Sequence, residues 1–333
     1  MEKEIRALIF IGLSVSTFFT YRETSAQPHQ VAVPSAEKPT PQVLSVAYSP
    51  DGKIVAGAMD NGSIELWSLA TDSQLRKMKL HSRVNSLCFS PDGKLFAAGG
   101  QDRIVTLWDV ASGKKLSNFV GHTNSVGGAE FSPNGKILAS ASYDRTIKLW
   151  NLKNKGRECR TLTGHLHSVF PIAFSPDGKL LASGSADKTV RIWNVDSGKE
   201  LRRLSGHAKI VDSVAFSPSG KILASGGYDK LINIWDVNTG TVLKSLPEQS
   251  GEIMSVAFSP DGKILAGSST DSTVKLWNVD TGQELKTITA DSKWFYCIKF
   301  SPDGRTIAGG CLNGTVKIWD VHSGKLLKNY VSD

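Results

Sequence analysis

The clearest repeating unit of the chain is the stretch 164–204, which reads GHLHSVFPIAFSPDGKLLASGSADKTVRIWNVDSGKELRRL. Its centre is the turn Ser175-Pro176-Asp177-Gly178, in which Pro presets the first dihedral angle and Gly accepts a left-handed conformation. A turn of this kind joins two antiparallel strands in a hairpin. The apolar runs and turn signals predict four short strands, over residues 169–174, 180–185, 190–195 and 200–204.

The same unit recurs along almost the whole chain. Seven Trp residues are separated by 41, 42, 43, 42, 42 and 42 residues: Trp67, Trp108, Trp150, Trp193, Trp235, Trp277 and Trp319. A Ser-Pro turn ending in Gly precedes each of them, first at residues 49–52 and last at residues 301–304. Regular self-similarity at this period predicts a repeat architecture.

Seven such units predict one closed ring. A single four-stranded sheet cannot bury both of its faces, but seven sheets arranged radially cover one another. We therefore expect an all-β fold, a single seven-bladed β-propeller of four-stranded antiparallel blades. The last unit encodes its own fourth strand at Lys325 to Tyr330, so every blade is complete without an N-terminal strand. Residues 31–33 could still compete for the same edge, and the mode of closure stays open.

The motifs resemble those of the WD40 family from about Val43 to Tyr330. The repeat Trp is followed by Asp109, Asp236 or Asp320 in three copies and by Asn151, Asn194 or Asn278 in three more. Three copies open with Gly-His, at residues 121–122, 164–165 and 206–207, and the copies near residues 42, 251 and 291 lack this pair. The resemblance implies a propeller that serves protein interaction.

Three copies carry side chains that could suggest a hydrolase. A Ser–His–Asp set is recognised by geometry, not by order in the sequence. In the WD family, however, such residues form a buried hydrogen-bond network with Trp, and a set that recurs three times is not expected to be catalytic. We therefore predict a structural network in each copy, and the residues are His122, Ser140, Asp144, Trp150; His165, Ser183, Asp187, Trp193; and His207, Ser225, Asp229, Trp235.

The N-terminus differs from the repeats. Residues 1–6 are charged, residues 7–19 are largely apolar, and small residues stand at 24–26, which is the layout of a signal peptide cleaved after Ala26. Residues 27–41 contain four Pro and predict a linker, and residues 42–333 form the propeller. The expected location is secreted or periplasmic, without a membrane span once the signal is removed. A retained segment would instead indicate a cytoplasmic protein.

Composition argues against metals, cofactors and nucleic acid. The four Cys residues show no CxxC spacing and no pairing pattern with His, so a structural zinc site is not expected. No Gly-rich phosphate loop precedes a helix, and no other cofactor is expected. Cys297 and Cys311 fall in one predicted hairpin, where a disulfide or two separate thiols are the alternatives. The net charge of +8 includes one Lys or Arg after each Ser-Pro turn, and Asp residues compensate five of these seven. No aromatic stacking pattern accompanies the basic residues, so nucleic-acid binding is not expected.

The opposite face varies from copy to copy and is the candidate for partner binding. One position per copy follows the first residue of the innermost strand, and it holds Leu44, Asn85, Gly127, Phe170, Asp212, Met254 and Tyr296. Clustered exposed aromatic and Met side chains form interaction hot spots. The candidate partner-binding residues are Leu44, Tyr143, Phe170, Tyr228, Met254, Trp294 and Tyr296. The alternative is that alternation in the strands turns several of them inward.

We expect a non-enzymatic platform, monomeric by itself, that holds a protein or peptide partner on the face of copies six, seven and one. Two alternatives stay open. One is an enzymatic or ligand-sensing propeller with its site in the central channel. The other is a cytoplasmic assembly scaffold. A fold by itself does not decide among them.

Overall fold

The computed structural model describes residues 40–154, 157–289 and 294–332. Thr40–Asp333 form one compact unit. The predicted signal peptide and almost all of the predicted linker lie outside the described residues, as does the competing stretch 31–33. Within the described part of the chain, no helix is long and apolar enough to cross a membrane.

The predicted architecture is confirmed. The chain forms seven sheets of four strands, and in each sheet four strands consecutive in sequence pair antiparallel. A short 3-10 helix, η1 (Leu152–Asn154), stands between β11 and β12. We number the sheets as blades one to seven in chain order.

The strands of blades one to four are β1 (Val43–Tyr48), β2 (Ile54–Met59), β3 (Ser63–Ser68), β4 (Gln74–Lys79), β5 (Val84–Phe89), β6 (Leu95–Gly100), β7 (Ile104–Asp109), β8 (Lys115–Val120), β9 (Val126–Phe131), β10 (Ile137–Ser142), β11 (Ile147–Asn151), β12 (Arg157–Leu162), β13 (Val169–Phe174), β14 (Leu180–Ser185), β15 (Thr189–Asn194) and β16 (Glu200–Ser205). Those of blades five to seven are β17 (Val211–Phe216), β18 (Ile222–Gly227), β19 (Ile232–Asp236), β20 (Val242–Ser245), β21 (Ile253–Phe258), β22 (Ile264–Ser269), β23 (Thr273–Asn278), β24 (Glu284–Thr289), β25 (Phe295–Phe300), β26 (Thr306–Cys311), β27 (Thr315–Asp320) and β28 (Leu326–Val331). The first two strands of the fourth copy have the predicted bounds, and the third begins and ends one residue earlier.

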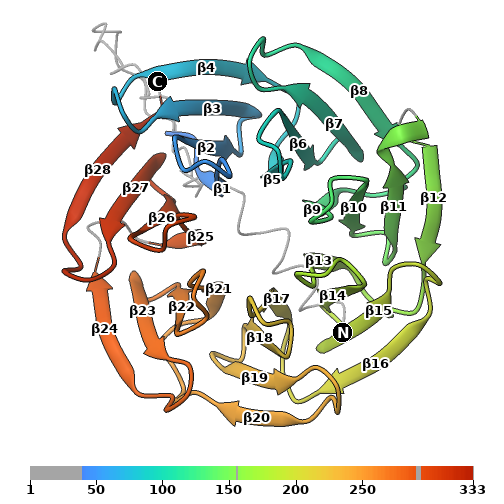
Figure 1. Cartoon of the computed structure of the whole chain (residues 1–333), viewed down its shortest axis with the longest axis vertical. Coiled ribbons are helices and arrows are strands. Elements are labelled where there is room, and N and C mark those ends of the chain that lie inside the picture. The colour runs from blue at the N-terminus through green and yellow to red at the C-terminus, as the bar shows by residue number, and fades with distance from the viewer. Residues whose placement is uncertain (1–39, 155–156, 290–293, 333) are drawn as a thin grey trace, which may run out of the picture. The chain divides into compact units, whose positions relative to one another are not determined.

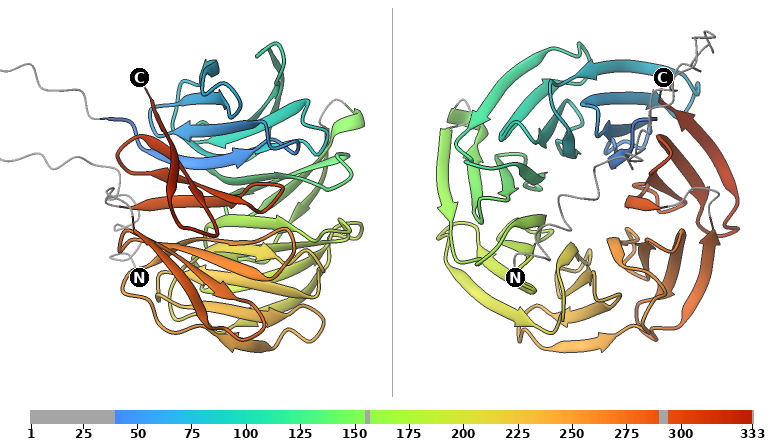
Figure 2. Two further views of the ribbon diagram at one scale, coloured as in Figure 1. Left: turned by 60° about the vertical axis from the view of Figure 1, so that its left-hand side comes forward. Right: turned by 180° about the vertical axis from the view of Figure 1, so that it is seen from behind.

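The blades are arranged in a ring (Figures 1 and 2). The innermost strand of each blade surrounds the axis and is seen nearly end-on in Figure 1, whereas the outermost strands lie along the rim. This change of direction within one blade is the right-handed twist of a β-sheet. Because successive strands are antiparallel, the starts of the innermost strands share a face with the turns between second and third strands. We call it the Gly-His face, and the opposite one the Ser-Pro face.

The core lies between the blades. Seven clusters of buried apolar side chains each combine residues of two adjacent blades, and one of them joins blade seven to blade one. The second strands are buried almost throughout, whereas the outer strands expose most of their residues. Each sheet is thus covered on both faces only because the ring is closed.

The Ser-Pro turns hold their shape through side-chain hydrogen bonds. In blade four, the Ser175 hydroxyl donates to Asp177 Oδ1 at 2.6 Å and accepts from the Leu180 N–H at 2.9 Å. Gly178 closes the turn with a φ of 70°, where only glycine is unstrained. The recurrence of this turn explains why the sequence spacing predicts the strands so well.

Within residues 40–332, ring closure does not interleave the two ends of the chain. Blade seven consists of β25 to β28 and blade one of β1 to β4. Side chains join the two blades instead: Tyr330 stacks on Trp67 with ring centroids 5.4 Å apart, its hydroxyl donates to Asp72 Oδ1 at 2.8 Å, and the Ser332 hydroxyl donates to Glu65 Oε1 at 2.8 Å. Packing and polar contacts close this seam.

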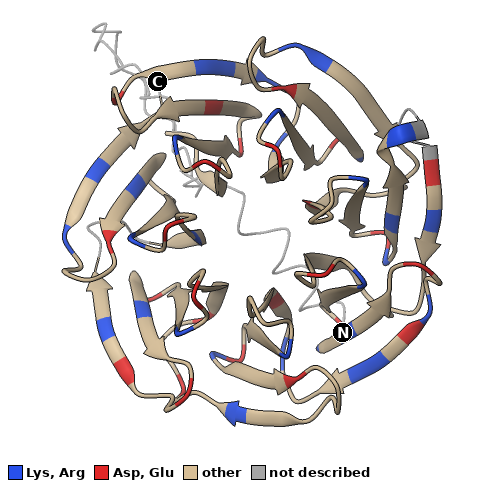
Figure 3. Cartoon of the chain, viewed as in Figure 1, with Lys and Arg blue, Asp and Glu red and all other residues tan. Residues whose placement is uncertain are grey.

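A ring of cationic side chains, which we call clasps, joins the rims of adjacent blades. Six outer strands carry Arg or Lys at the same register position, two residues beyond the partner of the repeat Trp. Each donates to a backbone carbonyl of the following blade, and the pairs are Arg76 to Ala111, Arg160 to Asp196, Arg202 to Asn238, Lys244 to Asp280, Lys286 to Ser323 and Lys328 to Leu69. Ser117 occupies this position in blade two. Figure 3 shows Lys and Arg along the rim.

The two cysteines of the predicted hairpin are not bonded to each other. Cys297 pairs in register with Gly310, and Cys311 pairs with Phe295 on the adjacent strand. Cys297 is a free thiol. Burial raises its pKa to about 12, so it stays protonated at neutral pH. Of the two alternatives, the structure shows separate thiols.

Candidate functional site

The repeated His, Ser, Asp and Trp residues of blades three, four and five lie in hydrogen-bond contact. In blade four, His165 Nδ1 is 2.8 Å from Asp187 Oδ2, and His165 Nε2 is 2.8 Å from the Ser183 hydroxyl. The Trp193 Nε1–H donates to the same hydroxyl at 2.8 Å. Blades three and five repeat this arrangement with the predicted residues.

In blade four the surroundings of the histidine favour its neutral form. Burial lowers the pKa of His165 below its usual value, although the hydrogen bond and charge of Asp187 act to raise it. Burial also opposes the charge on Asp187, but hydrogen bonds from His165, Thr189 and the Leu166 N–H hold its pKa well below the usual range. A neutral His165 with its proton on Nδ1 accepts from Ser183 at Nε2, which satisfies every polar group.

The same contacts leave little room for catalysis at serine. Ser140, Ser183 and Ser225 are each 0% exposed, and each hydroxyl already accepts from a Trp indole. A nucleophilic hydroxyl must be within reach of a substrate carbonyl. These hydroxyls are enclosed between strands, so the three sets act as internal ties between a loop and the second and third strands.

Blade two shows what happens without the serine. Ala98 occupies the position of Ser183, the buried Trp108 Nε1 has no hydrogen-bond partner, and His81 is exposed. The histidine turns inward only where a buried serine receives it.

The seven aligned positions at the starts of the innermost strands are β-bulges. In each of these strands the pairing register shifts at this position, for example between Val43 and Ser45 and between Val211 and Ser213. A bulge leaves one residue out of the ladder and redirects its side chain. This is the physical reason why the position varies so widely in residue type.

We call the Gly-His end of the ring axis the channel mouth, and it includes most of the predicted partner-binding residues. Tyr143, Tyr228, Met254, Trp294 and Tyr296 are half-buried there. Leu44 and Phe170 are buried, each 8% exposed. At these two bulges the side chain is turned inward, so two of the seven candidates are not part of an accessible surface.

Contacts between neighbouring blades set the shape of the channel mouth. Phe170 packs edge-on against Tyr143 with ring centroids 4.9 Å apart. A Cβ at Gly127 would stand 3.2 Å from the Tyr143 ring, so the small residue admits that ring. The Tyr296 hydroxyl donates to Gln42 Oε1 at 3.0 Å, and the Asn85 side chain donates to the Val126 carbonyl at 2.8 Å.

A carboxyl stands among the aromatic residues of the channel mouth. Burial and the charge of nearby Glu252 raise the pKa of Asp212 to about 7. The Asp212 charge is in turn the largest cause of a raised pKa at Tyr228, to which burial, Glu252, Tyr143 and Tyr296 also contribute. These groups of blades three, five, six and seven therefore lie within electrostatic reach of one another. In the sequence Asp212 stands out only as one of the seven aligned positions, and no motif marks Glu252.

Four further contacts between innermost strands were not predicted from the sequence. The hydroxyls of Ser45, Ser86, Ser213 and Ser255 each accept a hydrogen bond from a backbone N–H of the next blade's innermost strand, at 2.9–3.2 Å. Their signal in the sequence is a Ser two residues after the first Val or Ile of the strand. They tie the channel wall together, and Ser213 and Ser255 are buried whereas Ser45 and Ser86 are half-buried.

The channel wall also holds one acid and one base. Glu130 on β9 accepts from the Phe174 N–H at 3.1 Å, and burial raises its pKa to about 7, against the charge of Lys299. Lys299 on β25 is exposed. Burial raises the pKa of the nearby Cys88 thiol, which excludes a reactive thiolate at neutral pH.

The Ser-Pro face carries mixed charge, as the sequence indicates. Lys53, Lys179 and Arg305 lie 3.9 Å from Asp51, Asp177 and Asp303 respectively, and all six side chains are well exposed. Exposed pairs of this kind contribute little energy. The Asp carboxylates in these pairs reduce the attraction of the Lys and Arg side chains for an anion.

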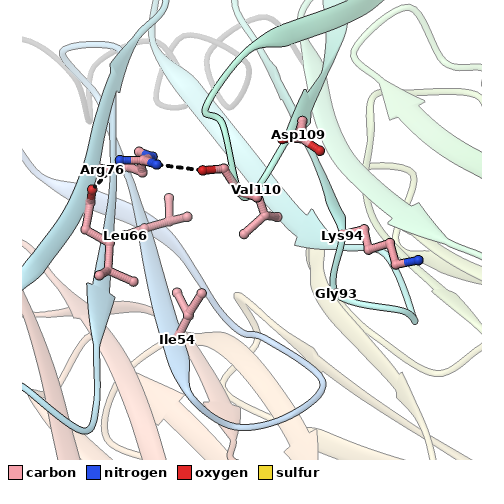
Figure 4. Close-up of a pocket in the computed structure, with 9 residues that line it drawn as sticks. Ile54, Leu66, Arg76, Gly93, Lys94, Asp109 and Val110 are labelled. Carbon is pink, nitrogen blue, oxygen red and sulfur yellow. Dashed lines mark hydrogen bonds between the residues drawn. The ribbon is translucent and has the colours of Figure 1, made fainter.

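A groove of about 600 Å³ lies at the rim between blades one and two (Figure 4). Ile54, Leu66 and Val110 line it with apolar side chains. The Arg76 clasp extends across it to the Ala111 carbonyl at 2.6 Å. Among the residues described, no group of three His, Cys, Asp or Glu side chains is placed to hold a metal ion.

Two protein-family models match the chain. The model described as the IFT122 first beta-propeller matches residues 153–330, and the model described as the Echinoderm microtubule-associated protein second beta-propeller matches residues 43–212. Each match spans slightly more than half of the chain, and together they cover all seven blades. A comparison with curated proteins found no match.

Proposed function

Since the chain belongs to the WD-repeat β-propeller family, we propose that it is a non-enzymatic platform that binds a protein or peptide partner over the channel mouth. Propellers of this family generally act as protein-interaction scaffolds. The observation that supports this site is the gathering of half-buried Tyr143, Tyr228, Met254, Trp294 and Tyr296 at one end of the axis. Aromatic and Met side chains of this kind dominate the binding energy of interfaces.

The non-enzymatic part of the proposal rests on the three His–Ser–Asp sets. Their hydroxyls are buried and already bonded to indole groups, and three equal sets fit a repeated structural role. The second candidate, a ligand-sensing or enzymatic channel, is favoured only by Glu130 and Lys299 on the channel wall. If it holds, Glu130→Gln should remove a small-molecule ligand response in a thermal-shift screen.

The test is a double substitution on blade seven, Trp294→Ala with Tyr296→Ala. The wild-type protein and the variant are each expressed in cells, cross-linked to the proteins that they bind, and isolated with them. A matched control replaces the exposed rim residues Leu201 and Leu285 with Ala, 46% and 51% exposed. We expect the wild type and the control to capture the same partners. The double variant should be folded but should no longer capture them. Equal capture by all three proteins would remove the channel mouth as the site.

We also propose that the protein is exported and monomeric by itself. The charged residues 1–6, the apolar residues 7–19 and the small residues 24–26 support export. N-terminal sequencing of the natively expressed protein should start at Gln27. A sequence that starts at Met1 would favour a cytoplasmic scaffold instead.

A further inference from the structure

Among the residues that the structure describes, none is a partner of the Asp212 carboxyl. It is half-buried at the bulge of β17, and among the described residues no hydrogen bond or ion pair involves its side chain. Three carboxylates on the same face are occupied, because Asp144, Asp187 and Asp229 each bind a histidine. A half-buried carboxyl without a donor is costly to keep in a folded protein.

Glu252 adds a second unpaired carboxyl beside it. Glu252 is half-buried just before β21, and its charge acts on Asp212. In the part of the chain that the structure describes, no Lys, Arg or His forms an ion pair with either group. Arg83 lies within electrostatic reach of Tyr143 and Tyr296, and its Nε donates to Asn85 Oδ1 at 3.1 Å.

Aromatic rings surround these carboxyls. Tyr228, next to the turn of the same blade, is close enough to Asp212 for that charge to be the largest influence on its hydroxyl. Tyr143 and Tyr296 also lie within electrostatic reach of Asp212. The hydroxyls of Tyr143 and Tyr228 have no hydrogen-bond partner among the described residues. Aromatic faces beside a carboxylate attract an organic cation through both charge and the ring quadrupole.

The carboxyl lowers stability as long as it stays unpaired. Its pKa of about 7 in the folded protein is above the ordinary value of 3.8, so the fold disfavours the ionised form. Stability is therefore expected to fall as the pH rises from about 4 to about 7, and the full cost is present above that range. Groups that cost stability in this way cluster at binding sites.

We propose that the channel mouth receives one protonated Lys or Arg side chain of the bound partner, with Asp212 as its principal counter-ion and Tyr143, Tyr228 and Tyr296 around it. This inference rests on the proposed partner-binding function and specifies its ligand chemistry. A metal ion fits less well, because the described residues offer no group of three potential ligands there and hard cations require more oxygen ligands.

The first experiment selects binders from a random-peptide library displayed on phage, with the full chain immobilised. Only peptides whose capture is lost with the Trp294→Ala and Tyr296→Ala double substitution are analysed. We expect one position in them to be enriched in Arg or Lys. Replacing that residue by Gln in a synthetic peptide should lower its affinity for the wild type about tenfold or more.

The second experiment assigns the counter-ion. Asp212→Asn should lower the affinity for the selected peptide by a similar factor. The peptide with Gln in place of the basic residue should bind the wild type and Asp212→Asn with equal affinity, as a double-mutant cycle requires. The matched control is Glu248→Gln, which removes one exposed carboxylate from the same face. Between pH 6 and pH 8 the affinity of the wild type should rise about tenfold, because Asp212 ionises in this range. Asp212→Asn should show no such rise.

The outcomes separate this inference from the proposed function. Two results would overturn the basic-side-chain inference and leave the platform intact. In one, the selected peptides depend on Trp294 and Tyr296 but have no preferred basic residue. In the other, they bind Asp212→Asn as well as they bind the wild type. If no peptide depends on Trp294 and Tyr296, both proposals fail. Circular dichroism and thermal melting verify that each variant is folded, and Asp212→Asn should melt higher than wild type at pH 8.

Discussion

At the scale of the residue, identical geometry does not mean identical chemistry. The contacts Asp187–His165–Ser183 have the order of a catalytic triad, with both distances at 2.8 Å. What differs is the surroundings of the hydroxyl, which is 0% exposed and accepts from the Trp193 indole. Recurrence in the sequence indicates a structural role, and burial supplies its physical reason.

We expect Ser183→Ala to lower the free energy of unfolding by about 2 kcal/mol, because both His165 Nε2 and Trp193 Nε1 lose a buried partner. The measurement is urea unfolding followed by tryptophan fluorescence. Ser205→Ala, an exposed serine in the same blade, is the matched control and should change stability little. Equal stability of both variants would contradict the network.

The converse substitution is available in blade two. Ala98→Ser would place a hydroxyl near Trp108 Nε1, which has no partner. We expect a gain of about 1 kcal/mol in the free energy of unfolding, the net value of one buried hydrogen bond. No gain in the same urea titration would show that the indole is satisfied by other means.

At the scale of the element, the outer strands do more than complete each sheet. Their alternation exposes one set of side chains and directs the clasp residues toward the next blade. The contact between blades two and three lacks a clasp, because Ser117 is too short to reach across. Six of the seven contacts thus share a polar link that a single blade cannot make.

Lys328 tests the value of a clasp where no peptide chain bridges the blades. Its ammonium donates to the Leu69 carbonyl at 2.6 Å and also contacts Asp72. We expect Lys328→Met to lower the free energy of unfolding by about 1–2 kcal/mol, as for a hydrogen bond of a charged group. Lys325→Met, an exposed Lys in the preceding turn, is the control for loss of charge. If the two variants unfold at the same urea concentration, the clasp contributes nothing.

At the scale of the whole molecule, stability depends on closure. Every interface between blades holds one apolar cluster, including the one that joins blade seven to blade one. Blades one and seven each contain four strands from the described part of the chain, so closure requires no exchanged strand. The Trp67–Tyr330 stack and the bonds to Asp72 and Glu65 replace it.

A pair of truncations tests this mode of closure. All contacts named at the seam lie within residues 40–332, so we expect a chain that begins at Thr40 to unfold at the same temperature as the full chain. Removal of residues 326–333, which include β28, should instead abolish cooperative unfolding, because the apolar cluster between blades seven and one is then open. Calorimetry measures both. A marked loss of stability in the first truncation would show that earlier residues take part in closure.

The repeat spacing alone was sufficient to predict the strands, their antiparallel order and the number of blades. Turns such as residues 175–178 and alternating strands depend on neighbours in sequence, and seven phased copies leave one way to bury their faces. The sequence likewise identified the His, Ser, Asp and Trp residues that meet in blades three to five, because each copy carries its own complete set.

Only the tertiary structure decided what the channel mouth is like. The bulges turn Leu44 and Phe170 inward and leave Tyr228, Trp294 and Tyr296 partly accessible, a choice that strand alternation leaves open. The clasps and the unpaired Asp212 depend on which side chains of other blades approach a given group. Such contacts join residues of separate blades, so their presence or absence is determined by the closed ring and is not encoded in any single repeat.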